Sequence, residues 1–164
     1  MEKLALAEVA TPPNFAEERA YYYGMPGHPK LIARTNTHPV FFEGPTWSLV
    51  RKSVEHVGRH RLADLWNDSM LSLQADIIRA LEDVTWTSID IHRVIYWSSP
   101  RTDRLTDRPA ILLISVAPNS TSWAQGHEVV MKCQTILEQH GVADVDCEMQ
   151  EPKVPRSDFS ATDL

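Results

Sequence analysis

Ala110-Ile111-Leu112-Leu113-Ile114-Ser115-Val116 is the one run in which near-continuous aliphatic side chains are free of charged residues. Pro109 precedes the run and Pro118 follows it, so residues that interrupt regular structure lie at both ends. A short run that is apolar at almost every position is typical of a strand buried on both faces. We therefore expect the fold to be built around a central strand over residues 110–116.

A second strand is predicted before the central one. Residues 85–97 alternate in polarity, with Ile89 and Ile91 among the side chains of the apolar face, and the pattern is irregular near His92 and Arg93. Alternation of this kind is typical of a strand with one buried face, and a break in it indicates a bulge. We expect this strand to run antiparallel to the central one.

Beyond the central strand, helical spacing returns over residues 122–140 and ends at Gly141, a residue type that is common just after a helix. Residues 144–149 then alternate in polarity again. The polar members of this alternation are Asp144, Asp146 and Glu148. One polar face is typical of a strand near a sheet edge. A right-handed strand–helix–strand crossover would make this last strand parallel to the central one.

Two helices are predicted before these strands. A short helix follows Pro45 over residues 46–54, and a longer amphipathic helix spans residues 62–84, where apolar positions recur at three- and four-residue steps. These positions are Leu62, Trp66, Met70, Leu73, Ile77, Leu81 and Val84. Together the patterns predict an α/β fold of the α+β kind, with a small three-stranded mixed sheet in the order helix, strand, strand, helix, strand.

Residues 1–44 are predicted to form an extended arm, followed by the α/β domain at 45–151 and a flexible tail at 152–164. Proline and glycine recur too often in the arm for a helix to persist. Large aromatic side chains distinguish it from a disordered tail, and those expected to bind a partner are Tyr21, Tyr22, Tyr23, Phe41 and Phe42. We expect the arm to lie over the domain or over a partner. An added strand from the arm, or a second copy of the chain, would widen the narrow sheet.

Length and charge narrow the class of protein. A chain of 164 residues suffices for one domain with its own core, and a net charge of −6 argues against nucleic-acid binding, which needs a surplus of Lys and Arg. No apolar run reaches the roughly 20 residues of a membrane span. Cys133 and Cys147 lack the spacing of a metal or redox motif. We therefore expect a cytoplasmic protein with reduced cysteines and without a membrane or nucleic-acid partner.

Several phrases of the sequence resemble a group of uncharacterised fungal proteins. They are Tyr23-Gly24-Met25-Pro26 with Pro29-Lys30-Leu31-Ile32-Ala33-Arg34, then Trp86-Thr87-Ser88-Ile89-Asp90, and then Asp144-Val145-Asp146-Cys147-Glu148-Met149-Gln150-Glu151. The resemblance spans most of residues 21–157 and includes no catalytic motif. Longer members of the group continue into a segment that resembles a degenerate trypsin-like domain, to which nothing in this sequence corresponds. The resemblance implies an intracellular module of unknown activity, comparable to an N-terminal domain of those longer proteins.

The loop after the central strand is the candidate ligand site. Its residues Asn119, Ser120, Thr121 and Ser122 stand where α/β proteins often bind anions on free backbone amides. Helix capping explains the same residues, because Ser122 and Gln125 have the spacing of a capping box. None of the serines has the G-x-S-x-G setting of an esterase nucleophile.

Two further groups of residues could hold a metal in principle. His56 and His60 would share one face of a helix, but Gly58 and the neighbouring arginines argue against a metal site there. Three carboxylates on one strand face would suit a metal-dependent nuclease or phosphatase, yet an edge strand needs polar residues in any case. The sequence therefore predicts no metal, no cofactor and no catalytic residue.

These observations favour a non-catalytic interaction or scaffold module that binds a protein partner, or a second copy of itself, through the arm. On this interpretation, removal of residues 1–44 abolishes association and leaves the domain folded. The alternative is a small-ligand or anion-binding protein, or a hydrolase, that uses the loop at 117–122.

Overall fold

The computed structural model describes residues 10–37, 39, 41–43, 48–97 and 108–153. The elements in chain order are α1 (Phe15–Ala20), β1 (Lys30–Arg34), β2 (Phe42–Glu43), β3 (Ser48–Leu49), β4 (Arg51–His56), α2 (Arg61–Asn67), α3 (Leu73–Ala80), β5 (Trp86–Trp97), β6 (Ala110–Val116), α4 (Trp123–Gln139) and β7 (Val145–Glu151). Five strands form one mixed sheet in the order β1-β7-β6-β5-β4, and β2 pairs with β3 in a separate ribbon.

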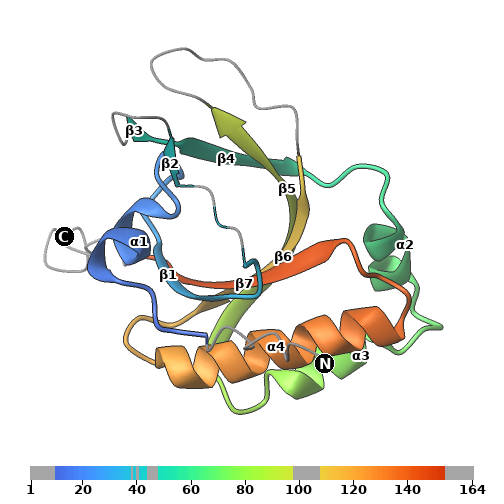
Figure 1. The fold of residues 1–164 in the computed structure, drawn as a ribbon. Coiled ribbons are helices and arrows are strands. Elements are labelled where there is room, and N and C mark those ends of the chain that lie inside the picture. Colours follow the sequence, from blue (N-terminus) through green and yellow to red (C-terminus); the bar gives the residue numbers. More distant parts are fainter. Residues whose placement is uncertain (1–9, 38, 40, 44–47, 98–107, 154–164) are drawn as a thin grey trace, which may run out of the picture.

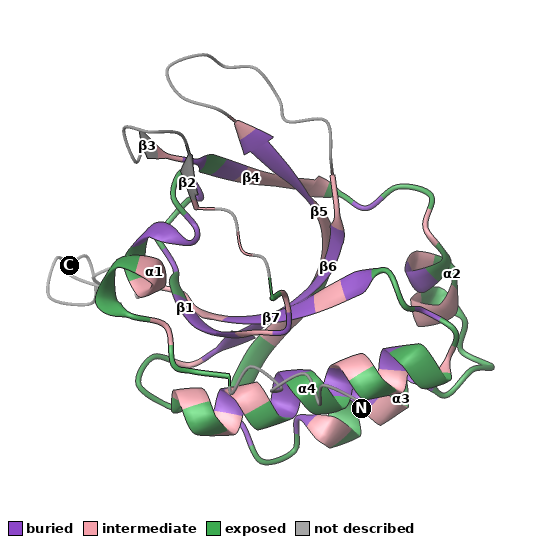
Figure 2. Ribbon diagram, in the orientation of Figure 1, coloured by how far each residue is buried: buried purple, intermediate pink, exposed green. Residues whose placement is uncertain are grey.

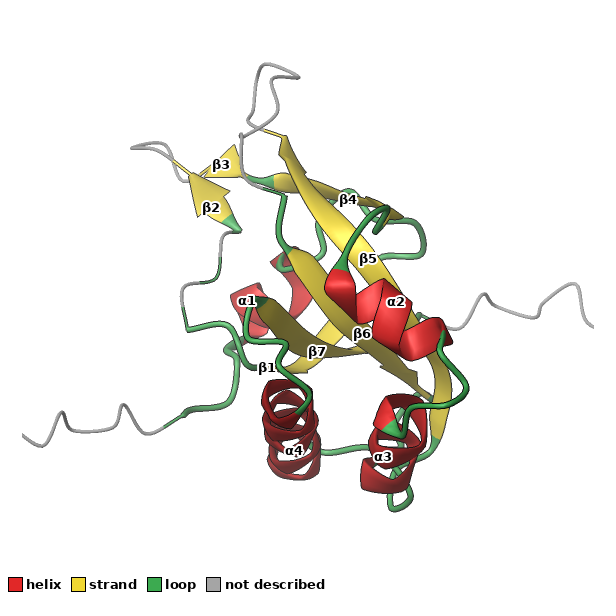
Figure 3. Cartoon of the chain, turned by 90° about the vertical axis from the view of Figure 1, so that its right-hand side faces the viewer, coloured by secondary structure: helices red, strands yellow, loops and turns green. Residues whose placement is uncertain are grey.

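The sheet is strongly curved, and different elements cover its two faces (Figure 1). Helices α3 and α4 lie side by side beneath one face, with α2 at their flank, as the perpendicular view in Figure 3 shows. Helix α1 and the turn after it lie on the other face. Strand β6 is the middle strand, and all seven of its residues are buried, which confirms the predicted central strand. Figure 2 shows that burial continues into much of β7 and β1, whereas β4 and the first part of β5 are mostly half-buried or exposed and the helices expose one side.

The predicted three-stranded sheet is confirmed in part. Strands β5, β6 and β7 occur where expected, β5 runs antiparallel to β6, and β6 runs parallel to β7. Two more strands complete the sheet, because β4 pairs with β5 and β1 pairs with β7. Strand β7 therefore lies near an edge of the sheet, as the sequence predicted, with one further strand outside it. Strand β1, which comes from the predicted arm, covers the side of β7 that the sequence pattern left open.

The predicted helix over residues 46–54 was wrong, because the structure forms strand β4 at Arg51–His56. Its side chains alternate between the two faces of the sheet. Lys52 points inward and is 2% exposed, whereas its neighbour Arg51 is exposed. Val50 and Val54 favour the extended backbone, because β-branched side chains fit the pleated surface of a sheet. A charged residue at an inward position hid this alternation in the sequence.

The predicted long helix over residues 62–84 is divided into α2 and α3. The break lies at Asp68, whose carboxylate accepts a hydrogen bond from the backbone N–H of Met70 at 2.9 Å. This local bond stabilises a turn in competition with the helix. Met70 is consequently 89% exposed, although the predicted stripe placed it in the core. Leu62, Leu73 and Ile77 are fully buried, as the stripe predicted.

Helix α4 begins and ends as the sequence predicted. The Ser122 side chain accepts a hydrogen bond from the backbone N–H of Gln125, and Gly141 follows the helix with a φ of 79°. Only half of the predicted capping box forms, since the Gln125 side chain bonds to the Asp83 carbonyl.

The bulge predicted near His92 lies instead earlier in β5, before Ser88. No helix in the described ranges is both long enough and apolar enough to cross a membrane.

Candidate functional site

Two tyrosines are brought over the sheet by the turn that follows α1. The helix starts at Asn14, whose side chain accepts a hydrogen bond from the Glu17 N–H at 2.8 Å, and it ends at Ala20. The chain then turns at Gly24, where φ is 94° and an added Cβ would lie 2.4 Å from the Arg51 side chain. Glycine therefore permits both the turn and its close approach to β4. The Lys52 N–H donates to the Tyr23 carbonyl at 2.7 Å and fixes the turn to that strand.

The turn completes a buried polar cluster, which we call the Glu148 cluster: Tyr21, Tyr22, Lys52 and Glu148. Tyr21 and Tyr22 each donate a hydrogen bond to one oxygen of the Glu148 carboxylate, at 2.9 and 2.7 Å. The Lys52 ammonium lies 3.3 Å from the centre of the Tyr21 ring. Lys52 is 2% exposed and Glu148 is 4% exposed, so both charges lie in the interior. The cluster joins three segments that are far apart in the sequence.

Burial changes the acidity of the groups in this cluster. It lowers the pKa of Lys52 from 10.5 to about 8, and Glu148 partly opposes this shift because a nearby anion stabilises the charged amine. Burial, followed by the Glu148 charge, raises the pKa of Tyr21 and Tyr22 well above 10, since both factors disfavour phenolate. The two tyrosines therefore remain hydrogen-bond donors to Glu148 at neutral pH.

An ion pair lies beside the cluster, nearer the surface. Arg34 on β1 donates from Nε to Glu17 on α1 at 2.7 Å. It also donates to the Asn36 carbonyl. Arg34 and Glu17 act on the pKa of Lys52 in opposite directions. The arrangement thus contains two carboxylates and two cations, and each carboxylate accepts hydrogen bonds from side chains of the protein itself, while the Lys52 ammonium lies over the Tyr21 ring.

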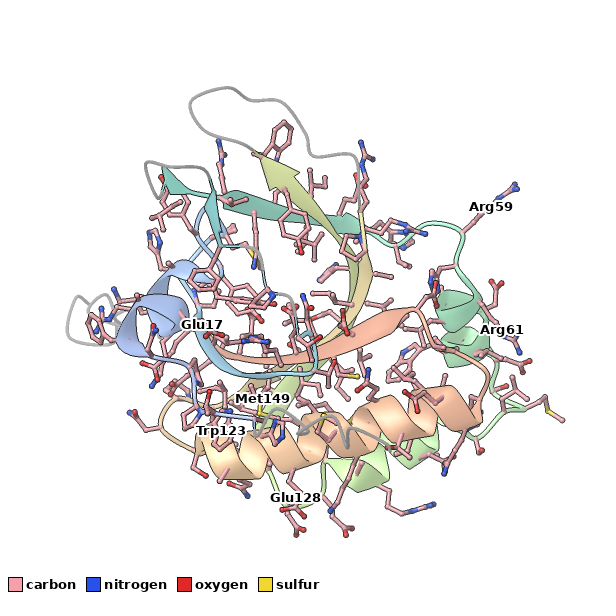
Figure 4. All side chains as sticks on the ribbon, in the orientation of Figure 1. Glu17, Arg59, Arg61, Trp123, Glu128 and Met149 are labelled. Atoms are coloured by element: carbon pink, nitrogen blue, oxygen red, sulfur yellow. The ribbon has the colours of Figure 1, made fainter. Side chains whose placement is uncertain are left out.

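A hollow of about 440 Å³ opens at the outer edge of β1, and we call it the β1-edge hollow. Leu31 and Ala33 both line it, although Leu31 packs with the tyrosines and Ala33 packs with the helices on the other face. Because the hollow reaches residues that pack on both faces of the strand, we place it at the strand's outer edge, where Ala10, Thr11 and Pro13 of the segment before α1 also line it. From α4, Trp123 and His127 line the hollow, and their rings stack with centroids 5.0 Å apart. Figure 4 labels Trp123 at the start of that helix.

The loop predicted to bind a ligand uses its donors within the protein. The Asn119 N–H donates to the Glu151 carboxylate, and the Ser122 hydroxyl caps α4. The Ser120 hydroxyl donates to the Ala117 carbonyl and lies 3.1 Å from the Thr121 hydroxyl oxygen. A carboxylate of the chain itself thus occupies the position that an anion was expected to take.

The histidines and acids considered for a metal do not converge. His56 ends β4, and its ring accepts a hydrogen bond from the Gly58 N–H. His60 caps α2 through one ring nitrogen and lies 3.0 Å from the Asp144 carboxylate through the other. Glu148 faces the tyrosines. Across the described residues no three His, Cys, Asp or Glu side chains gather where they could hold a metal ion.

The aromatic residues of the predicted partner-binding arm have different surroundings. Tyr21 and Tyr22 are buried in the protein's own core, so their rings are not available to a partner in this structure. Tyr23 is 42% exposed, and Phe41 packs at the edge of the core with its ring 6.3 Å from that of Tyr21. The side chain of Phe42 lies outside the part of the chain that the structure describes.

Sequence reasoning did not identify the Glu148 cluster or the β1-edge hollow. One signal was available for the cluster, because Lys52 interrupts an alternation in which Val50 and Val54 are the apolar members. No local pattern could connect Lys52 with Glu148, which lies in a strand three positions away in the sheet.

Comparison of the chain with protein families, with curated protein sequences and with solved structures finds no match.

Proposed function

We propose that the protein is a non-catalytic interaction module that binds an extended segment of a partner protein along the outer edge of β1. The observation that carries this proposal is the position of β1 at the end of the sheet, next to the β1-edge hollow. The Glu148 cluster supports it as well, because its carboxylate accepts hydrogen bonds from two tyrosines and both Glu148 and Lys52 are buried away from the surface.

The edge strand of a sheet can bind an extended peptide through backbone hydrogen bonds. Strand β1 bonds to β7 on one side only, and among the described residues no backbone hydrogen bond joins its other side to another segment. The N–H and C=O groups on that side can pair with an added strand, which is the usual basis of peptide recognition by sheet edges. The hollow leaves about 440 Å³ beside this edge for side chains of such a strand.

The side chains around the hollow would give an added strand its specificity. The stacked Trp123 and His127 rings and the half-exposed Met131 form an apolar surface beside the strand. Arg34 and Glu17, also at the hollow, supply one charge of each sign. A partner segment with a large apolar side chain directed at Trp123 fits these surroundings, because aromatic residues often dominate binding energy.

Two features limit indiscriminate pairing at this edge. The register between β1 and β7 shifts between Leu31 and Ala33, and charged residues stand at both ends of β1. Irregularities and charges of this kind protect edge strands from aggregation. They restrict pairing to a short segment, which favours a particular partner over general self-association.

The test uses a displayed library of random peptides selected on the intact protein. We expect the selected peptides to shift the backbone amide resonances of β1, and Trp123→Ala to weaken their binding about tenfold. Trp86→Ala removes a partly exposed tryptophan from β5 and serves as the matched control, with binding unchanged.

Three results would contradict the proposal. The first is a selection without binders, and the second is a set of peptides that shift resonances elsewhere and ignore Trp123→Ala. The third is a dimer that is detected by light scattering and whose formation shifts the amide resonances of β1. A second copy of the chain would then take the place of the partner.

The expected cytoplasmic location remains a proposal. It is supported by Cys133 and Cys147, which are both free thiols and both buried. Burial raises the pKa of the Cys133 thiol to about 12, so the reactive thiolate is disfavoured. Free, unreactive cysteines are common in reducing compartments.

A further inference from the structure

A second hollow, of about 480 Å³, lies at the end of the sheet where β7 finishes and β1 begins. Its rim includes three prolines, Pro29, Pro118 and Pro152, and we call it the proline-rimmed hollow. The charged or titratable side chains that line it are Glu18, Arg19, His28, Lys30, Glu151 and Lys153. Its volume is within the range of small-molecule sites.

The acids of this hollow are already paired. Lys30 lies 3.8 Å from Glu18 and 3.9 Å from Glu151, so one ammonium serves both carboxylates. Arg19 and Lys153 have no acidic partner among the described residues, and the Arg19 guanidinium lies over the Phe15 ring. Within the described part of the chain, the hollow therefore combines two cations that have no acidic partner with acids that are already paired, in a chain whose net charge is −6.

Several backbone features hold the walls of the hollow in place. Glu151 accepts a hydrogen bond from the Asn119 N–H, which attaches the end of β7 to the loop before α4. His28 has a φ of 46°, a conformation that non-glycine residues adopt at an energetic cost. Proline also fixes the backbone at three points of the rim. A hollow with fixed walls loses little entropy when it binds a ligand.

We propose that the proline-rimmed hollow binds a small organic dianion, such as a dicarboxylate or a phosphate monoester. Arg19 would bind one carboxylate, or two oxygens of the phosphate, through its planar guanidinium, and Lys153 would bind the other carboxylate, or the remaining phosphate oxygen, as a point charge. The site is separate from the β1-edge hollow and goes beyond the proposed interaction function. It lies beside the loop at 117–122, but it relies on side-chain cations and not on the loop amides.

The test is a titration of the full chain with two probes, succinate and glycerol 3-phosphate, followed by backbone amide resonances. We expect saturable shifts at His28 and Lys153, and about tenfold weaker binding in the double variant Arg19→Gln/Lys153→Gln. Arg19→Lys, which keeps the charge and loses the planar fork, should fall between that variant and the unchanged protein. The two probes distinguish a carboxylate ligand from a phosphate ligand.

Arg59→Gln is the matched control, because Arg59 is exposed and projects into solvent on the opposite side of the molecule from α1 (Figure 4). It should bind the probes like the unchanged protein. Equal weakening in Arg59→Gln would show that the probes respond to net charge alone and would overturn the proposal. Unchanged binding in the double variant, or no saturable shift with either probe, would overturn it too.

Discussion

At the scale of single residues, Glu148 shows how a polar pattern can be misread. Its alternation with apolar neighbours is typical of a solvated strand face, yet the side chain is 4% exposed. The carboxylate is stable there because two tyrosine hydroxyls and the charge of Lys52 replace water. The partners are residues 21, 22 and 52, and the sequence around Glu148 contains no pattern that predicts contacts with them.

We expect Glu148→Ala to lower the free energy of unfolding by about 3 kcal/mol, because it leaves a buried ammonium without its anion and two hydroxyls without their acceptor. Glu148→Gln keeps a hydrogen-bond acceptor for the tyrosines and should lower the free energy of unfolding by less. Chemical denaturation measures both changes. Glu138→Ala, at an exposed position of α4, is the control and should change the value by less than about 0.5 kcal/mol. A cost at Glu148 as small as that of the control would mean that the cluster is not a major source of stability.

Lys52 should make stability depend on pH in the alkaline range. The folded protein releases the Lys52 proton near pH 8, whereas the unfolded chain keeps it until about pH 10.5. Raising the pH through this range therefore favours the folded state. Relative to Lys52→Met, the unfolding free energy of the unchanged protein should rise by about 3 kcal/mol between pH 7 and pH 10.5. The comparison removes the effects of other titrating groups. A constant difference between the two proteins would contradict the buried position of this amine.

At the scale of elements, the strong periodicities in the sequence were sufficient to predict the helices and strands that carry them. Strands β5 and β6, helix α4 and the parallel strand β7 follow from alternation, helical spacing and the handedness of crossovers. The weaker sequence patterns, over β4 and between α2 and α3, led to wrong predictions for physical reasons. Strand β4 contains a buried lysine, and the turn between α2 and α3 depends on a local bond from Asp68 that competes with the helix.

Helix α4 lies close to the sheet at Gly126. An added Cβ there would lie 2.9 Å from Ile32 on β1 and 3.0 Å from the sulfur of Met149 on β7. We expect Gly126→Val to lower the free energy of unfolding by about 3 kcal/mol, since extra carbon atoms in a packed contact force the elements apart. Ala124→Val introduces the same residue at an exposed position of α4 and should cost under about 1 kcal/mol. Equal costs for the two variants would show that the helix can move away from the sheet freely.

At the scale of the whole molecule, the N-terminal segment is the largest difference from the sequence interpretation. The pattern of prolines and glycines predicted an arm that could lie over the domain and add a strand, and β1 is such a strand. What the pattern could not show is the extent of this integration. Tyr21, Tyr22 and Leu31 belong to the core, and the pairing of β1 with β7 joins residues more than a hundred positions apart.

Both candidate sites depend on the position of the N-terminal segment. The β1-edge hollow and the proline-rimmed hollow both form where the N-terminal segment meets α4 or the end of β7. Neither could be predicted from the sequence, because each depends on contacts between distant segments. Both should therefore disappear if the N-terminal segment is removed.

The most direct test is the unfolding of a chain that begins at residue 35, compared with the full chain by guanidinium denaturation. Without β1 and the two tyrosines, Glu148 and Lys52 lose most of their partners and β7 becomes an unprotected edge. We expect the shortened chain to show no cooperative unfolding transition. A cooperative transition with an unchanged midpoint would mean that the N-terminal segment is a dispensable arm, and it would contradict the central role given to the Glu148 cluster.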